Sequence, residues 1–162
     1  MGCPALDGRS VEDLLPRAAR LGVVVVQNPT HFTIGELLVE RFGVRHRYQP
    51  LRSLLQAGVR LALGSDGPMN PFLNILLAST HPARPEEALT RVQALDAYTR
   101  GSAFAEHAEG EKGTLAPGQL ADLAVLSRDI FQVHADELPA TTSVLTIVGG
   151  QVVHDAGLLD RR

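Results

Sequence analysis

An aspartate between two glycines is the residue of this sequence best placed to do chemistry. Asp66 lies in the loop at residues 64–68, which follows the apolar run at residues 59–63. Gly64 and Gly67 let the backbone turn tightly and approach a ligand. An aspartate there could bind a divalent metal or take a proton from a metal-bound water. It could equally cap the next turn or helix, and the spacing alone leaves both roles open.

A second polar loop, at residues 27–31, follows the valine run at residues 23–26. His31 in this loop could be a metal ligand or a substrate contact, because imidazole serves both purposes. Loops at strand ends carry function more often than other segments do. A loop histidine can also be merely solvated or bonded to a backbone carbonyl, so this alternative stays open.

Other candidate groups lack the spacing that chemistry requires. The sequence has no His-x-His pair, no His-Glu-x-x-His, no Gly-x-Ser-x-Gly and no phosphate-binding glycine loop. Cys3 is interpreted as an incidental thiol. The remaining histidines are predicted to lie at the surface or in turns, and they are His46, His81, His107, His134 and His154.

The elements that must position Asp66 and His31 are two strands in an alternating pattern with helices. The run at residues 23–26 is apolar at every position, which is typical of a strand buried on both faces in a parallel sheet. Residues 59–63 form the second strand. Helices are expected at residues 10–22, 34–42, 50–57, 71–79, 85–96 and 102–108. This alternation predicts an α/β fold with parallel strands.

The pattern changes near residue 110, after a charged, glycine-bearing link. A strand is expected at residues 120–126, and a β-hairpin at residues 144–154 turns at Gly149 and Gly150. We therefore expect two regions, an α/β part at residues 1–109 and a small β part at residues 110–162.

Composition excludes several classes of function. The 162 residues are 44% hydrophobic with a net charge of -3, which is typical of a globular domain. The sequence has no basic run with interleaved aromatics, so a nucleic-acid partner is not expected. No apolar run is long enough for a membrane span. One cysteine excludes an intrachain disulfide, and no secretory signal is evident, so a cytoplasmic location is expected.

Several segments, in order, resemble the amidohydrolase superfamily, most closely its N-substituted formamide deformylase-like branch. Residues 21–31 (LGVVVVQNPTH) resemble the seventh barrel strand, and residues 54–68 are similar to the eighth strand and its approach. Residues 86–105 resemble the family's "EAL…AYT" helices. Residues 112–126 resemble the return into the flanking β-sandwich, and residues 148–153 its closing hairpin. Each match is short, but the series is fairly specific.

The resemblance implies the last two strand–helix units of a (β/α)8 TIM-like barrel, followed by part of a small β-sandwich. It implies metal-assisted hydrolysis of a non-peptide C–N bond, such as an amide, formamide or cyclic amide, in a small-molecule substrate. Asp66 matches the family's eighth-strand aspartate, which helps bind the divalent metal, most often zinc, and shuttles the proton of the nucleophilic water. Asn28 and His31 fall on a loop that often faces substrate.

The resemblance also implies ligands that this sequence lacks. The family holds its metal with a His-x-His pair on the first strand, a lysine or acid on a middle strand, and histidines on the fifth and sixth strands. A whole barrel needs roughly 250 residues, and a lone aspartate does not make a catalytic zinc site. We therefore expect the isolated chain to be inactive.

Two other classes of function stay open. The chain could be an inactive truncated remnant that associates with itself or with a missing half, because an open barrel fragment exposes unpaired edges and an apolar face. It could also be a non-catalytic small-molecule binding module that uses the strand-end loops.

Overall fold

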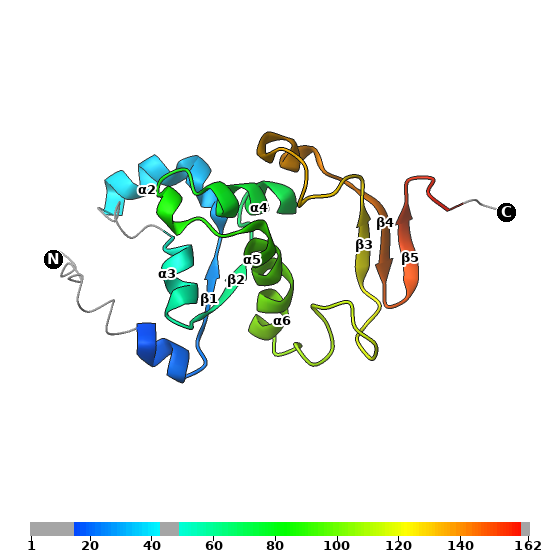
Figure 1. Cartoon of the computed structure of the whole chain (residues 1–162), viewed down its shortest axis with the longest axis horizontal. Helices are drawn as coiled ribbons and strands as arrows, with labels where there is room; N and C mark the ends of the chain where they lie inside the picture. The colour runs from blue at the N-terminus through cyan, green and yellow to red at the C-terminus, as the bar shows by residue number, and fades with distance from the viewer. Residues whose placement is uncertain (1–14, 43–48, 160–162) are drawn as a thin grey trace.

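A two-stranded parallel sheet forms the centre of the N-terminal part of this computed structural model, which describes residues 15–42 and 49–159. Strand β1 (Val24–Gln27) pairs with β2 (Arg60–Leu63), with Val24 opposite Arg60 and Gln27 opposite Leu63. A helix that includes residues 15–20 precedes β1. The segment between the strands contains η1 (Pro29–Ile34), α2 (Gly35–Phe42) and α3 (Leu51–Gln56). This order confirms the predicted α/β alternation (Figure 1).

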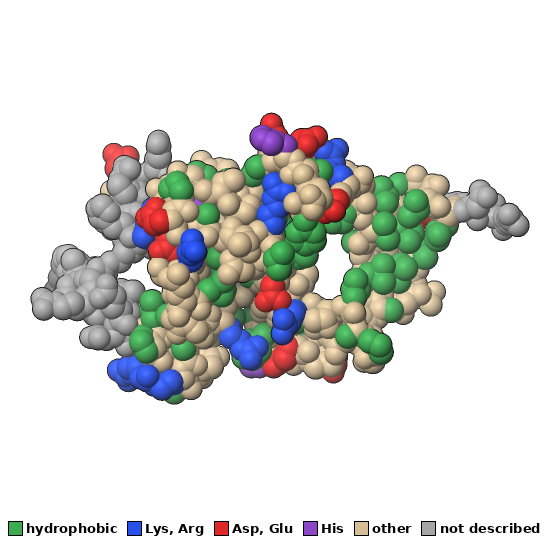
Figure 2. Space-filling view, in the orientation of Figure 1, with side chains coloured by type: hydrophobic (Ala, Val, Ile, Leu, Met, Phe, Trp, Pro, Cys, Tyr) green, Lys and Arg blue, Asp and Glu red, His purple; other side chains and the backbone are tan. Residues whose placement is uncertain are grey.

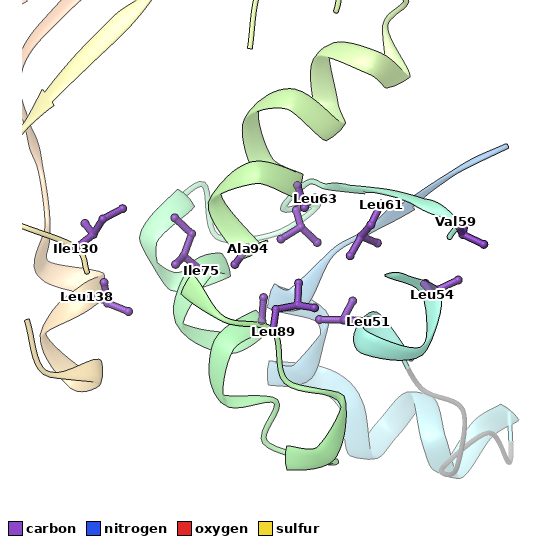
Figure 3. Close-up of a cluster of buried hydrophobic side chains, with 12 residues drawn as sticks. Leu51, Leu54, Val59, Leu61, Leu63, Ile75, Leu89, Ala94, Ile130 and Leu138 are labelled. Carbon is purple, nitrogen blue, oxygen red and sulfur yellow. The ribbon is translucent and has the colours of Figure 1, made fainter. Parts of the chain in front are cut away.

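Helices after β2 complete this part of the molecule. They are α4 (Pro71–Thr80), η3 (Pro85–Glu87), α5 (Arg91–Asp96), η4 (Ala97–Gly101) and α6 (Ser102–Ala105). The core lies between β2 and these helices, and Figure 3 shows its side chains converging from α3, β2, α4 and α5. Its largest fully buried apolar side chains are Leu51, Ile75, Leu138 and Val59.

The two strands differ in burial. In β2, Leu61, Ala62 and Leu63 are all buried. In β1, Val26 is 54% exposed, so the prediction that the valine run is buried on both faces is wrong for this strand. The physical reason is that too few elements cover β1, because in the described part of the chain it pairs with β2 alone. Val25 still packs against the core.

The predicted single helix at residues 85–96 is interrupted. The turn η3 ends at Glu87, the backbone of the next residue Ala88 is extended, and α5 begins after Thr90. The Thr90 side chain accepts from the backbone N–H of Gln93, while the Gln93 side chain accepts from the N–H of Thr90. This capping box satisfies N–H groups at a new helix start, which favours a break there over a continuous helix.

The π-helical turn η4 runs directly along β2. A Cβ atom added at Gly101 would lie 2.1 Å from the carbonyl oxygen of Leu61, so only glycine permits this approach. The predicted helix at residues 102–108 is shorter than expected, because α6 ends at Ala105 and His107 adopts a positive φ of 59°.

The C-terminal part is a three-stranded antiparallel sheet in the order β3–β4–β5. Its strands are β3 (Leu123–Leu126), β4 (Ser143–Val148) and β5 (Gln151–Asp155). The expected hairpin is confirmed, with Gly149 and Gly150 at φ of 56° and 78°. The sheet carries many exposed apolar side chains, and Figure 2 shows them gathered over its strands.

A short helix ties the C-terminal part to the rest. In η5 (Ala135–Ala140), Leu138 is fully buried within the same core as Ile75. The Arg91 guanidinium donates to the carbonyl oxygens of Ile130 and Val133 at 2.8 and 2.7 Å. No helix was predicted at η5 from the sequence. No helix in the described ranges is long and apolar enough to cross a membrane.

Candidate active site

The candidate site lies where β1 and β2 end side by side. Gln27 and Leu63 are paired at the ends of the strands, and the N–H of Gly64 donates to the carbonyl of Gln27 at 2.9 Å. Because the strands are parallel, the segments that follow them leave from the same edge of the sheet. In (β/α)8 barrels this edge carries the reactive groups. The two polar loops predicted from the sequence are thus neighbours in space.

His31 and Asp66 meet at this edge. Nε2 of His31 lies 3.2 Å from Oδ2 of Asp66, which is the distance of a hydrogen bond or ion pair. The side chain of His31 is 28% exposed and that of Asp66 is 77% exposed. Asp66 adopts a positive φ of 40°, a conformation that aspartate tolerates better than most residues. The pair therefore presents an imidazole and a carboxylate to solvent.

Asn28 reaches the same edge but is not seen to contact either of these side chains. Its side-chain oxygen lies over Gly64, where an added Cβ would approach it to 2.7 Å. Its backbone carbonyl accepts from the buried amide of Gln49 at 2.8 Å. A larger residue at position 64 would therefore have to displace the side chain of Asn28.

Tyr98 was missed by the sequence analysis, which used it only as part of a family motif. Burial raises the pKa of the Tyr98 hydroxyl, and a hydrogen bond with the Ser65 side chain partly opposes this shift. Tyr98 thereby contacts the residue that precedes Asp66. It is carried by the π-helical turn η4, whose position depends on Gly101.

The described residues do not complete a metal centre. His31 and Asp66 offer one imidazole nitrogen and one carboxylate, whereas a catalytic zinc site uses about three protein ligands plus water. Within residues 15–42 and 49–159, no group of three or more His, Cys, Asp or Glu side chains could hold a metal ion. His46 and Cys3 lie outside the described residues. Hence no reaction step is assigned to a metal held by this chain alone.

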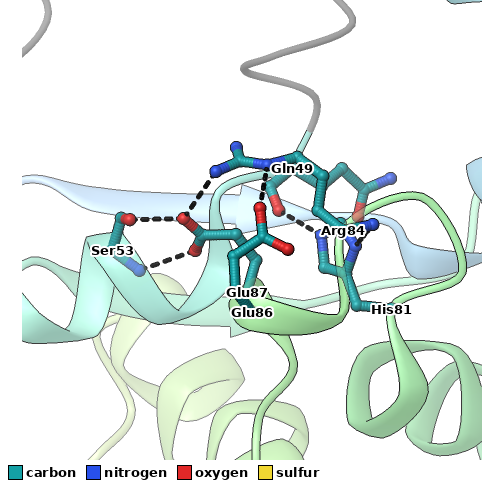
Figure 4. A network of polar contacts seen from close by, with 6 residues as sticks. All are labelled: Gln49, Ser53, His81, Arg84, Glu86 and Glu87. Atoms are coloured by element: carbon teal, nitrogen blue, oxygen red, sulfur yellow. Dashed lines mark hydrogen bonds and ion pairs between the residues drawn. The ribbon is translucent and has the colours of Figure 1, made fainter.

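His81 forms a separate polar network in the interior (Figure 4). It was predicted to lie at the surface or in a turn, and it does cap the end of α4, but it is fully buried. The backbone N–H of Arg84 donates to Nδ1 at 3.0 Å, so Nε2 carries the proton and donates to the carbonyl of Gln49 at 2.8 Å. The other predictions hold, since His107, His134 and His154 are exposed.

A buried carboxylate extends this network. Glu87 is 3% exposed and accepts from the backbone N–H of Ser53 at 2.8 Å and from its hydroxyl. The Arg84 guanidinium donates to Glu87 at 3.2 Å. These contacts join η3 to the start of α3, so the network fixes the fold rather than presenting groups to a ligand.

Comparison with known proteins identifies the family. A sequence model of the Amidohydrolase family matches residues 2–154. The chain is 34% identical over 147 residues to an N-substituted formamide deformylase of Arthrobacter pascens, covering 83% of this chain and 27% of that protein. It is 31% identical over 159 residues to the Bacillus subtilis (strain 168) protein YtcJ, which is named as an amidohydrolase, covering 88% of this chain and 30% of that one.

Solved structures agree with this result. A metal-dependent hydrolase from Pyrococcus furiosus matches with a TM-score of 0.66 and 27% identity, over 75% of this chain and 27% of that one. An adenosine deaminase from Xanthomonas campestris with bound zinc shares the fold, with a TM-score of 0.69 at 22% identity over 93% of this chain and 36% of that one. The chain spans less than a third of the length of the curated relatives described above, and it belongs to the amidohydrolase family.

Proposed function

We propose that this chain supplies the seventh and eighth strand–helix units of a barrel that hydrolyses a C–N bond other than a peptide bond. The substrate would be a small amide, formamide or cyclic amide. Residues 1–109 would form the barrel part and residues 110–162 the segment of a β-sandwich. The observation that carries the proposal is the contact of His31 with Asp66 at the ends of two adjacent parallel strands.

Asp66 is the proposed catalytic residue. Its exposed carboxylate would accept a proton from the attacking water and deliver it to the leaving nitrogen, as a general base and then a general acid. The imidazole of His31 would orient the carboxylate and contact the substrate. Asn28 would contact the substrate from the same loop.

A divalent metal, with zinc as the first choice, is part of the proposal for the whole protein. Asp66 would be one of its ligands, and the others would come from strands outside this chain, because the described residues offer too few donors. A cytoplasmic location is proposed as well, since one cysteine leaves no intrachain disulfide.

Self-association is a second candidate, and exposed apolar strands favour it. Val26 of β1 is 54% exposed, and Val152 and Val153 of β5 are 49% and 60% exposed. Edge strands with apolar side chains tend to pair with another chain. Analytical ultracentrifugation of the isolated chain would test this, and a monomer at all concentrations would contradict it.

The experiment for the enzymatic proposal is a chimera. The matching 147-residue stretch of the Arthrobacter pascens protein is replaced by this chain, and hydrolysis of N-substituted formamides is measured with zinc present. We expect hydrolysis by the chimera, and none by the isolated chain, which should hold less than one tightly bound zinc by elemental mass spectrometry. An isolated chain that binds zinc and hydrolyses amides would contradict the need for further strands. A folded chimera without activity would contradict the proposed reaction.

A further inference from the structure

Thr30 connects the two loops of the candidate site and is only 2% exposed. Its backbone N–H donates to Oδ1 of Asn74 at 3.1 Å, and its hydroxyl donates to the backbone carbonyl of Ser65. Its own carbonyl accepts from the hydroxyl of Thr33 at 2.7 Å. All three polar groups of Thr30 are therefore bonded, and its β-branched side chain has little rotamer freedom. The position of Thr30 relative to the eighth-strand loop is fixed.

Asn74 is a fully buried amide in the middle of α4. Its oxygen must face the N–H of Thr30, so its nitrogen faces the other way and donates to the carbonyl of Asn70 at 3.2 Å. Asn70 is held in turn, because its side chain caps α4 and donates to the carbonyl of Pro139 at 2.9 Å. The amide of Asn74 thus has one orientation, set by partners at both ends.

These bonds flank the candidate pair on both sides. Thr30 precedes His31 in the chain, and its hydroxyl holds the carbonyl of Ser65, which precedes Asp66. We propose that Thr30 and Asn74 are positioning residues that hold His31 in contact with Asp66. The inference deepens the proposed function and rests on it only in naming His31 and Asp66 as the site.

Other residues must hold His31 and Asp66 in contact, because the pair itself is exposed. Pairs of charged groups at the surface are held weakly, since water competes for both partners and side-chain entropy opposes a single geometry. With Asp66 77% exposed, the 3.2 Å contact depends on how the two backbones are placed. The buried contacts of Thr30 and Asn74 supply that placement.

The test uses nitrogen NMR of the imidazole of His31 in the isolated, isotope-labelled chain. Asp66→Asn first defines the His31 resonances that result when the carboxylate is replaced. Thr30→Val keeps the shape and the backbone N–H but removes the hydroxyl that reaches Ser65, and we expect it to shift the His31 resonances toward those of Asp66→Asn. Thr80→Val is the matched control, because its hydroxyl bonds only within its own helix, to Leu76 at 2.9 Å.

A second variant tests the role of Asn74. Asn74→Ala leaves the N–H of Thr30 without its acceptor, so hydrogen exchange at that amide should accelerate about tenfold. Exchange at Gly64, which is bonded to Gln27, should stay unchanged. A merely structural role for Asn74 would accelerate both amides alike.

The outcomes separate the two proposals. Unchanged His31 resonances in Thr30→Val, or equal acceleration at both amides in Asn74→Ala, would overturn the positioning role. If Asp66→Asn itself leaves the His31 resonances unchanged, the contact does not persist in solution and both the positioning role and the site geometry are overturned. An inactive chimera with the expected NMR shifts would refute the proposed reaction alone.

Discussion

His31 and His81 each contact another segment of the described chain, and their surroundings are opposite. His31 contacts the carboxylate of Asp66 on the solvent side of the sheet edge, and its side chain is 28% exposed. His81 is fully buried, with both ring nitrogens bonded to backbone groups. A ring whose bonds are all internal stabilises the fold, whereas a ring that shares an exposed carboxylate can exchange partners with a ligand. Burial and bonding thus separate a structural region from a candidate active site.

The largest expected effect concerns Asp66 and would sharpen this contrast. In the active chimera, Asp66→Asn should lower kcat/KM by roughly 10²–10⁴, because the carboxylate that transfers the proton is lost. In the isolated chain the same change should alter the free energy of unfolding by less than about 0.5 kcal/mol, since surface changes usually do little. Enzyme kinetics and urea unfolding measure the two effects. Full activity of the variant would remove Asp66 from the catalytic role.

The buried network should show the reverse pattern. Glu87→Ala removes a buried carboxylate and leaves the Ser53 N–H and hydroxyl without it, so we expect a loss of about 2–4 kcal/mol in the free energy of unfolding. Glu86→Ala is the neighbouring control, because the Glu86 carboxylate pairs with Arg84 at the exposed surface, and we expect it to lower the free energy of unfolding far less than Glu87→Ala does. Equal effects of both variants in urea unfolding would contradict the structural role of the network.

The same substitution at the two histidines compares the regions directly. His81→Leu removes two buried hydrogen bonds of the ring, one to the carbonyl of Gln49 and one from the N–H of Arg84, which should destabilise the chain by about 2 kcal/mol. His31→Leu should change stability by less than about 0.5 kcal/mol. Thermal and urea unfolding of both variants would measure this difference. A larger loss at His31 than at His81 would invert the assignment of the two regions.

The smallest expected effect belongs to Tyr98, the half-buried group beside the candidate site. Burial raises the pKa of Tyr98 above its unfolded value, so the folded state retains a proton that the unfolded state releases. Ionisation of Tyr98 therefore leaves the free energy of unfolding unchanged below about pH 10. It lowers this free energy as the pH rises through the pKa of Tyr98 in the unfolded state and then its pKa in the folded state. Tyr98→Phe should flatten this alkaline decline in urea unfolding measured from pH 9 to 11. An unchanged decline would contradict the shift.

Local patterns predicted the strands and the chemistry-bearing loops. The runs at residues 23–26 and 59–63 form two parallel strands, as predicted. Because parallel strands end at the same edge of the sheet, the loops that follow them bring His31 and Asp66 together. The glycine pair at residues 149–150 fixed the hairpin. These features depend on short-range sequence, where periodicity and turn chemistry are informative.

Features that depend on distant partners could not be predicted. The burial of His81 arises from Gln49 and Arg84 around it, and no spacing in the sequence reveals such a pocket. The exposure of Val26 depends on which elements lie beside β1, which the valine run does not specify. The role of Thr30 was hidden for the same reason, because its partner Asn74 is 44 residues away.

The packing of η5 against α4 gives the chain a property of split proteins. Leu138 is buried in the core, and Arg91 donates hydrogen bonds to the carbonyls of Ile130 and Val133. The two parts are therefore held together by these contacts as well as by the connecting segment at residues 109–121. Cleavage of the peptide bond within that exposed segment should leave two fragments that elute together from a sizing column. Expressed separately, the same two fragments should find each other by complementation, with η5 joining them through its buried Leu138.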